Sequence, residues 1–305
     1  MNKLEKEILE KYQVRKTKQQ KAAFIRLLQS RFPELKIQEG GFPKNRNLIL
    51  GDVDTAKVLL TAHYDTCNAS WLPNLMVPML PWFRSLYSLL IVGPMLAIAL
   101  LAGWLAARPS GSQAVLLTVY LLVYAAMFLV QFVCGIPNRH NANDNTSGVI
   151  TLLRTYSMMT DAEKEITALV FFDNEEYGCR GSEWMYKQRK EAMAEKLVIN
   201  FDCVADGDHF LLLATADGLN IHGAELKAAF APGDGKAVTI ADSKNTKLSS
   251  DHKHFPRSVG IAAMHENKWL KLCTGRIHTR RDTIFQEENI DFLATGTKAF
   301  LESLT

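Results

Sequence analysis

The sequence predicts an α/β fold with a central mixed, largely parallel sheet flanked by helices, and with two inserted transmembrane helices. Apolar runs bounded by polar residues alternate with helical patterns, as in layered α/β folds. Residues 68–137 contain only two charged side chains, Arg84 and Arg108, which predicts the insertion. Elsewhere the composition is that of a globular protein, and the net charge of +3 over 305 residues gives no reason to expect a nucleic-acid partner.

The soluble parts supply the layers of this fold. Residues 3–32 predict two helices broken near residues 14–17, with Phe24, Leu27 and Leu28 on one face of the second helix. Strands are predicted at residues 35–38, 47–50, 57–62, 166–172, 196–201 and 260–264. Helices are predicted at residues 147–159, 182–194, 221–230 and 287–304.

The apolar block predicts a transmembrane hairpin. Residues 86–107 and 114–134 carry no charge, and about 20 helical residues cross a bilayer core. A short polar turn joins them, so both ends of the hairpin emerge on the same side. We therefore expect a soluble domain of residues 1–67 and 138–305, with a helical part at 1–34, and residues 68–137 inserted into it. Two buried core helices are the alternative.

Charge and cysteine content favour a cytoplasmic soluble domain in a two-span membrane protein. Residues 11–26 carry six basic side chains and no acidic one, which also predicts a solvated helix face. Arg84 and Arg139 flank the hairpin, against Arg108 in its turn, and positive charge is retained in the cytoplasm. The five cysteines have no disulfide spacing, which fits a reducing compartment.

Acidic and histidine side chains follow several predicted strands. His63 and Asp65 follow the third run, Glu175 and Glu176 the fourth, and Asp202 the fifth. In open α/β sheets, ligands bind beyond the carboxyl ends of the strands, so these residues are expected at one edge. Two polar loops add further candidates, Asp144 and His278.

These residue types suit zinc in a hydrolytic site. Five ligands serve two ions if one carboxylate bridges them, and the candidates are His63, Asp144, Glu176, Asp202 and His278. Asp65 can orient the His63 ring from two residues away, and adjacent Glu175 and Glu176 can divide proton transfer and metal binding. Singly, each residue is more often a turn, cap or surface residue. Cys67, Cys179 and Cys203 are predicted to be buried thiols rather than ligands.

Six short motifs, in this order, resemble the signature of the family 28 zinc metallopeptidases. They begin at His63, Asn143, Phe171, Asn200, Ser250 and His278. The resemblance implies a mixed sheet of about eight strands, flanked by helices in the manner of these peptidases. It also implies two zinc ions bridged by Asp144, with Glu175 as general base and Asp65 as the residue orienting His63.

For the remaining residues, the resemblance implies that His63 and Asp202 bind one zinc ion. Glu176 and His278 bind the other. Asp251 is a candidate for ordering the site. In relatives the loop before the bridging aspartate is short, whereas Asp65 and Asp144 are 79 positions apart here, and the hairpin occupies that loop.

The leading hypothesis is a membrane-anchored zinc aminopeptidase that hydrolyses N-terminal peptide bonds with a bridging metal-bound water and Glu175 as base. Its expected partners are a peptide substrate and a lipid bilayer contacted by residues 86–134. A glutaminyl cyclase, which shares the fold of the family, is one alternative. A non-catalytic membrane receptor or scaffold on a peptidase fold is another. The sequence leaves the oligomeric state open.

Overall fold

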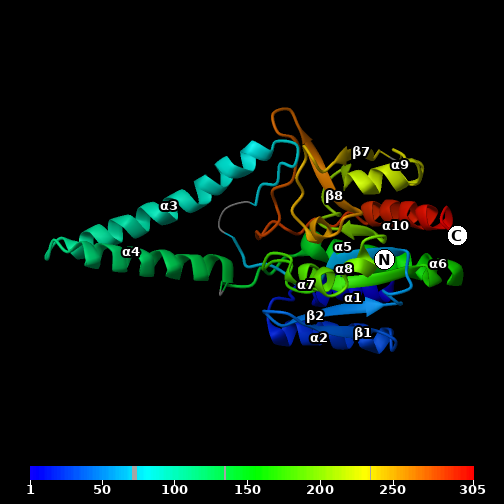
Figure 1. The fold of residues 1–305 in the computed structure, drawn as a ribbon, viewed down its shortest axis with the longest axis horizontal. Helices are drawn as coiled ribbons and strands as arrows, with labels where there is room; N and C mark the ends of the chain where they lie inside the picture. The colour runs from blue at the N-terminus through cyan, green and yellow to red at the C-terminus, as the bar shows by residue number, and fades with distance from the viewer. Residues whose placement is uncertain (71–73, 134, 234) are drawn as a thin grey trace.

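The computed structural model describes residues 1–70, 74–133, 135–233 and 235–305 (Figure 1). Within these ranges a mixed nine-stranded sheet forms the centre of the molecule. Its strands in spatial order are β1 (Lys36–Gly40), β2 (Asn45–Leu50), β4 (Thr167–Phe172), β3 (Val58–His63), β5 (Leu197–Phe201), β8 (Ser258–Asn267), β6 (His209–Ala214) and β7 (Ala237–Asp242), and β9 (Lys271–Cys273) pairs with β8. Strands β4, β3, β5 and β8 run parallel, so their carboxyl ends share one edge.

The predicted mixed sheet flanked by helices is confirmed, and all six predicted strands are present. The sequence analysis did not predict β6, β7 or β9. Strand β7 is the edge strand and is only partly buried along its length, so it lacks the continuous apolar run that marks the central strands.

Helices cover both faces of the sheet. One face carries the larger core and is covered by α1 (Lys3–Lys11), α2 (Lys18–Arg31), α5 (Gly148–Met158), α9 (Ala216–Ala229) and α10 (Glu287–Glu302). The other face packs against α7 (Arg180–Gln188) and α8 (Lys190–Met193). Leu59 and Leu60 of β3 point into these two different cores, which explains why the strand is apolar throughout.

Side-chain hydrogen bonds cap the first turns of several helices. Asn2 and Thr17 form capping boxes at the starts of α1 and α2, so the predicted pair of helices broken near residues 14–17 is present. Helix α9 begins five residues earlier than predicted, because the Thr215 hydroxyl accepts a hydrogen bond from the backbone N–H of Gly218. The helix predicted at residues 182–194 is divided at Arg189 into α7 and α8.

The apolar block forms two long helices that extend away from the sheet (Figure 1). They are α3 (Pro81–Ala107) and α4 (Gln113–Phe128), and a π-helical segment, η1 (Leu129–Val133), continues α4. The helices pack closely at Gly103, where an added Cβ would lie 2.5 Å from the carbonyl oxygen of Leu116. Cys134, the last residue of the predicted second span, lies outside the described residues.

By length and composition, two segments can cross a membrane: α3 and the helix of residues Gln113–Gln131 that joins α4 to η1, with mean hydropathies of 2.3 and 2.2. Only 17% of the most apolar window of α3 is buried, and none of the corresponding window of the second helix. The alternative of two buried core helices is therefore wrong.

Candidate metal centre

Three adjacent parallel strands bring acidic and histidine side chains to one edge of the sheet. His63 is the last residue of β3, Asp202 directly follows β5, and the segment 173–176 directly follows β4. The order β4-β3-β5 makes these strand ends neighbours in space. Asp144, at a kink with non-helical backbone angles within the segment η2 (Ala142–Ser147), and His278, in the loop after β9, complete the group.

Asp144 lies at the middle of the group, and its two carboxylate oxygens face different partners. Its Oδ1 is 3.3 Å from His63 Nε2, which is also 3.5 Å from Asp202 Oδ1. Its Oδ2 is 3.0 Å from His278 Nε2, which is also 3.3 Å from Glu176 Oε2. The structure thus brings all five predicted metal ligands together.

The donor atoms fit zinc. A tetrahedral zinc ion about 2.0–2.2 Å from each ligand holds its ligand atoms about 3.3–3.5 Å apart. The four nitrogen–oxygen separations around Asp144 are 3.0–3.5 Å. In addition, the buried Oε1 of Glu176 has no hydrogen-bond partner among the described residues. Imidazole and carboxylate donors at this spacing suit a pair of such ions.

The charges of the group favour bound cations. Burial opposes a proton on His278, but the carboxylates of Glu176 and Asp144 outweigh it and raise the His278 pKa to about 10. Burial raises the pKa of Glu176 to about 8. Burial also raises the pKa of Glu175 well above its usual range. Carboxylates crowded in this way repel one another, and positive charge between them relieves that repulsion.

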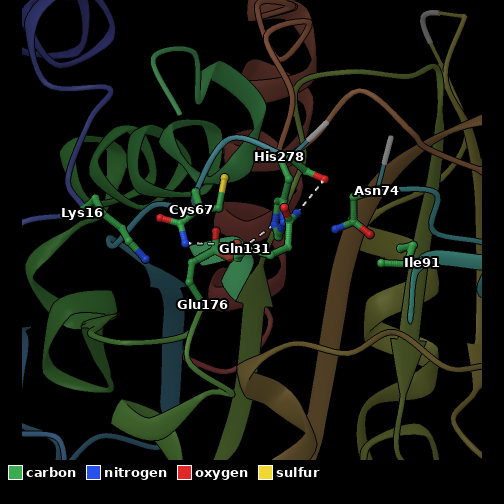
Figure 2. A pocket seen from close by; sticks show the side chains of 9 residues that line it. Lys16, Cys67, Asn74, Ile91, Gln131, Glu176 and His278 are labelled. Atoms are coloured by element: carbon green, nitrogen blue, oxygen red, sulfur yellow. Dashed lines mark hydrogen bonds and ion pairs between the residues drawn. The ribbon is translucent and has the colours of Figure 1, made fainter. Parts of the chain in front are cut away.

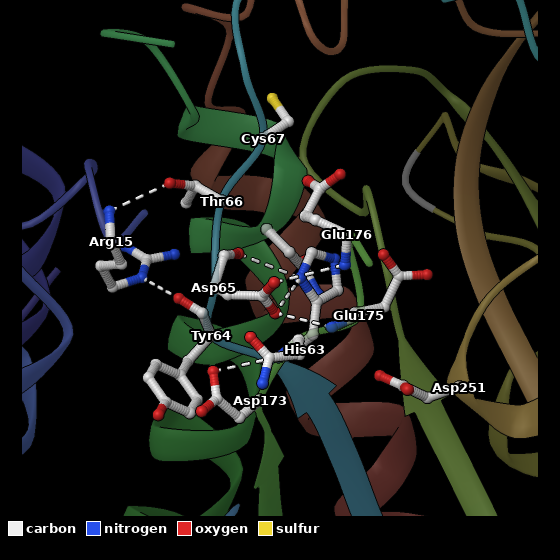
Figure 3. A network of polar contacts seen from close by, with 12 residues as sticks. Arg15, His63, Tyr64, Asp65, Thr66, Cys67, Asp173, Glu175, Glu176 and Asp251 are labelled. Atoms are coloured by element: carbon white, nitrogen blue, oxygen red, sulfur yellow. Dashed lines mark hydrogen bonds and ion pairs between the residues drawn. The ribbon is translucent and has the colours of Figure 1, made fainter. Parts of the chain in front are cut away.

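Asp65 contacts both His63 and the two adjacent glutamates (Figure 3). Its backbone carbonyl oxygen is 3.1 Å from His63 Nδ1, so an N–H at that nitrogen leaves Nε2 free to face Asp144. Its carboxylate accepts hydrogen bonds from the backbone N–H groups of Glu175 and Glu176, at 3.0 and 3.2 Å. Asp65 Oδ1 lies 3.6 Å from His63 Nδ1, so the carbonyl is the closer partner of the ring.

The loop of Asp144 is fixed by hydrogen bonds to its neighbours. The carboxylate of Asp282 accepts from the backbone N–H groups of Asn143 and Asp144, at 2.7 and 3.1 Å. The side chain of Asn145 donates to the carbonyl oxygen of Phe201 at 2.8 Å and accepts from Gly148 N–H at 2.9 Å. These bonds join the Asp144 turn to the end of β5.

Two buried cations of the N-terminal helical part support the centre, and the sequence analysis missed them. Lys21 Nζ lies 2.5 Å from Asp173 Oδ1, directly before the two glutamates. Arg15 is fully buried and donates to the carbonyl oxygen of Tyr64 and to the Thr146 hydroxyl. The prediction of a solvated helix face is wrong for these two residues. The spacing of Lys21 from Phe24 and Leu28 is the signal that could have placed it on the buried face.

Three buried free thiols border the carboxylates. Cys203 donates to Asp202 at 3.1 Å, and Cys179 donates to Glu175 Oε1 at 3.2 Å. Cys67 Sγ lies within 4.8 Å of donor atoms of Glu176 and His278. The remaining candidate, Asp251, accepts a 2.5 Å hydrogen bond from Ser182 and contacts none of the five ligands through a hydrogen bond.

Cavities open directly over the group. One of about 380 Å³ is lined by Asp144, Glu175, Glu176, Asp202 and His278. A second of about 220 Å³ shares Glu176 and His278 with it and also reaches Cys67 (Figure 2). A substrate can therefore reach the carboxylates and His278 through these cavities.

The mixed sheet carries its carboxylate–imidazole cluster beyond the ends of the parallel strands, where α/β proteins bind their ligands, and this arrangement is typical of a metalloenzyme. The sequence model described as peptidase family M28 matches residues 133–301, more than half of the chain. The chain therefore belongs to peptidase family M28, which makes it a metallopeptidase by family and implies zinc.

Solved structures share the fold at low sequence identity. An aminopeptidase of Legionella pneumophila, LapA, is 13% identical with a TM-score of 0.54, over 99% of this chain and 68% of its own. A glutaminyl cyclase of Porphyromonas gingivalis is 16% identical with a TM-score of 0.56, over 99% and 96%. A glutaminyl cyclase of an Acidobacteriales bacterium is 15% identical with a TM-score of 0.52, over 99% and 92%. The sequence matches none of the curated proteins.

Proposed function

We propose that the protein is a membrane-anchored, zinc-dependent aminopeptidase that hydrolyses the first peptide bond of its substrate. The observation that carries this proposal is the position of Asp144, with one oxygen toward the His63–Asp202 pair and the other toward the His278–Glu176 pair. Two zinc ions that share Asp144 would use all five ligands. His63 and Asp202 would hold one ion, and His278 and Glu176 the other.

When bound, zinc would lower the pKa of a water molecule and polarise the scissile carbonyl. Glu175 would act as the general base. It is half-buried, its pKa is raised well above the usual range by burial, and the Cys179 thiol donates to its Oε1. Glu175 Oε2 would therefore take the proton from the attacking water and deliver it to the leaving amine.

Asp65 and the buried cations would act by positioning. The Asp65 carboxylate binds the backbone N–H groups of both glutamates, so it fixes the direction of their side chains relative to His63. Lys21 fixes Asp173 in the same turn. A base held this way is oriented before substrate binds, which lowers the cost of reaching the reactive geometry.

A glutaminyl cyclase is the second candidate. It is favoured by the Porphyromonas gingivalis enzyme, which matches this fold over 96% of its own length. Cyclisation is an acyl transfer within one substrate, and one zinc ion suffices to polarise the amide. We favour hydrolysis because the chain offers ligands on both sides of Asp144.

Metal content and product analysis test the proposal together. The full chain in detergent is expected to contain two zinc ions by elemental analysis, to cleave aminoacyl chromogenic substrates, and to release free N-terminal amino acids from a peptide panel. Pyroglutamate formed from glutaminyl peptides without released amino acids would instead identify a cyclase. Bound zinc with neither product would identify a receptor or scaffold.

The proposal includes two membrane spans with the peptidase domain in the cytoplasm. It is supported by the length and hydropathy of both helices and by the positive charge that flanks the hairpin. A Ser110→Cys variant places a thiol in the polar turn at the far end of the hairpin. A membrane-impermeant maleimide added to intact cells should label this thiol, and labelling only after lysis would contradict the orientation.

A further inference from the structure

We propose that the substrates are peptides bound to the bilayer surface, whose N-terminal residue reaches the metal centre between the bases of the two membrane helices. This inference rests on the proposed aminopeptidase function and adds the class of substrate. The structural basis is that both helices contribute side chains to the cavities over the centre.

Helix α3 lines the larger cavity. Tyr87, Ser88 and Ile91 line the cavity of about 380 Å³ together with Glu175 and with every candidate metal ligand except His63. The adjoining cavity of about 220 Å³ is lined by Ile91 from α3 and by Gln131 from η1, together with Glu176 and His278 (Figure 2). The two ends of the hairpin therefore border the route to the centre.

The length of α3 indicates where the cavity lies relative to the bilayer core. The helix has 27 residues and is about 40 Å long. A bilayer core is about 30 Å thick, so about 10 Å of the helix extends into the headgroup layer. The sheet lies at the Pro81 end, so this excess falls in the first two turns, which border the cavity. Trp82, 63% exposed, lies in these turns, where tryptophan is favoured at membrane interfaces.

Arginine side chains lie beside the base of the second helix. A cavity of about 890 Å³ shares Gln131 with the smaller cavity and is lined by Arg139, Arg280 and Arg281. None of these three arginines forms a salt bridge with any other residue of the described chain. Anionic headgroups attract such arginines, which would hold the opening against the bilayer surface.

The test compares two substrates in one membrane. The full chain is reconstituted into vesicles of three parts phosphatidylcholine to one part phosphatidylglycerol. One substrate is a short leucyl peptide, and the other is the same peptide with a C-terminal acyl chain that anchors it in the bilayer. We expect the anchored peptide to be cleaved with a kcat/KM at least tenfold higher, and the Ile91→Trp variant to reduce that preference to below threefold by narrowing the opening.

Ile98→Trp is the matched control, because Ile98 is 52% exposed farther along the same helix and lines none of these cavities. It should keep the wild-type preference. Equal cleavage of both peptides by the wild type would overturn this inference and leave the aminopeptidase proposal intact. A preference that survives Ile91→Trp would also overturn it, because simple partitioning into vesicles would then explain the preference. Failure to cleave either peptide with zinc bound would instead refute the aminopeptidase proposal.

If the Ile91→Trp variant does not fold, which its zinc content would reveal, equal cleavage of both peptides by the wild type still overturns the inference, and a change of lipid replaces the variant. Replacing phosphatidylglycerol by phosphatidylcholine gives an independent measurement. The preference for the anchored peptide should fall when the arginines lose their anionic partners, and no change would contradict the role given to the basic cavity.

Discussion

The two halves of the metal centre are built differently. The His63 half lies on the ends of two adjacent parallel strands, and its histidine side chain is 1% exposed. The His278 half lies on loops, and its histidine side chain is 29% exposed and faces the cavities below the hairpin. His278 also adopts a left-handed backbone conformation, with φ of 59°, which is uncommon outside glycine.

This difference suggests a division of labour. A ligand on a paired strand is held by the sheet, and the carbonyl of Asp65 fixes the His63 ring as well. Ligands on loops depend on the local turn and on contacts near α3 and η1. We therefore expect the strand half to bind its ion more tightly and the loop half to exchange its ion with solvent.

Replacement of Asp144 should remove bound zinc from both halves of the centre. Asp144→Ala removes the carboxylate whose two oxygens face His63 and His278, and leaves each remaining pair of residues with too few ligands for tetrahedral zinc. Zinc is expected to fall from two ions per chain to none, and peptidase activity to background. Two zinc ions per chain by elemental analysis would contradict the shared role.

Replacement of Glu175 should remove catalysis and leave zinc bound in both halves of the centre. Glu175→Gln retains the shape of the side chain but cannot accept the proton, and loss of a general base costs about 10²–10⁴ in rate. Zinc content should stay at the wild-type value. Glu165→Gln, at an exposed position before β4, is the matched control and should retain full activity. Full activity in Glu175→Gln would refute the assignment.

Separate replacement of the two histidines should distinguish the halves. His278→Ala is expected to retain one tightly bound zinc ion, whereas His63→Ala should lose the tight ion and retain only an exchangeable one. Timed dialysis of the wild type against a chelator should then show two phases, with the faster phase missing in His278→Ala. A single phase in the wild type would show that the halves are equivalent.

The smallest effect is expected at Asp65. Asp65→Asn keeps the backbone carbonyl that faces His63 but weakens the acceptor for the two glutamate N–H groups. Loss of such a supporting group typically costs about 10–100-fold in metal affinity or activity. Competition with a chromogenic chelator measures the loss. A complete loss of zinc would show that Asp65 is itself a ligand.

The strand half was the easier part to predict from the sequence. His63 and Asp202 each follow an apolar run, and the ends of neighbouring parallel strands meet. Arg15 and Lys21 escaped prediction because, apart from Tyr12, their hydrogen-bond partners are 49–153 residues away, and a basic run usually indicates a solvated surface. Ile91 and Gln131 escaped it because only the direction of the helices brings them over the centre.

The position of β3 has a consequence for biogenesis. Its two neighbours in the sheet both follow the hairpin, and the first of them, β4, begins about 100 residues later in the chain, before β5. At a translation rate of about 5–20 residues per second, roughly 5–20 s pass between the synthesis of β3 and that of its first neighbouring strand. Under the proposed topology, the translocon would receive the hairpin during this interval, so the nascent sheet would close only after the chain is tethered. The enzyme would therefore mature on the membrane, and zinc loading would follow the emergence of His278 from the ribosome.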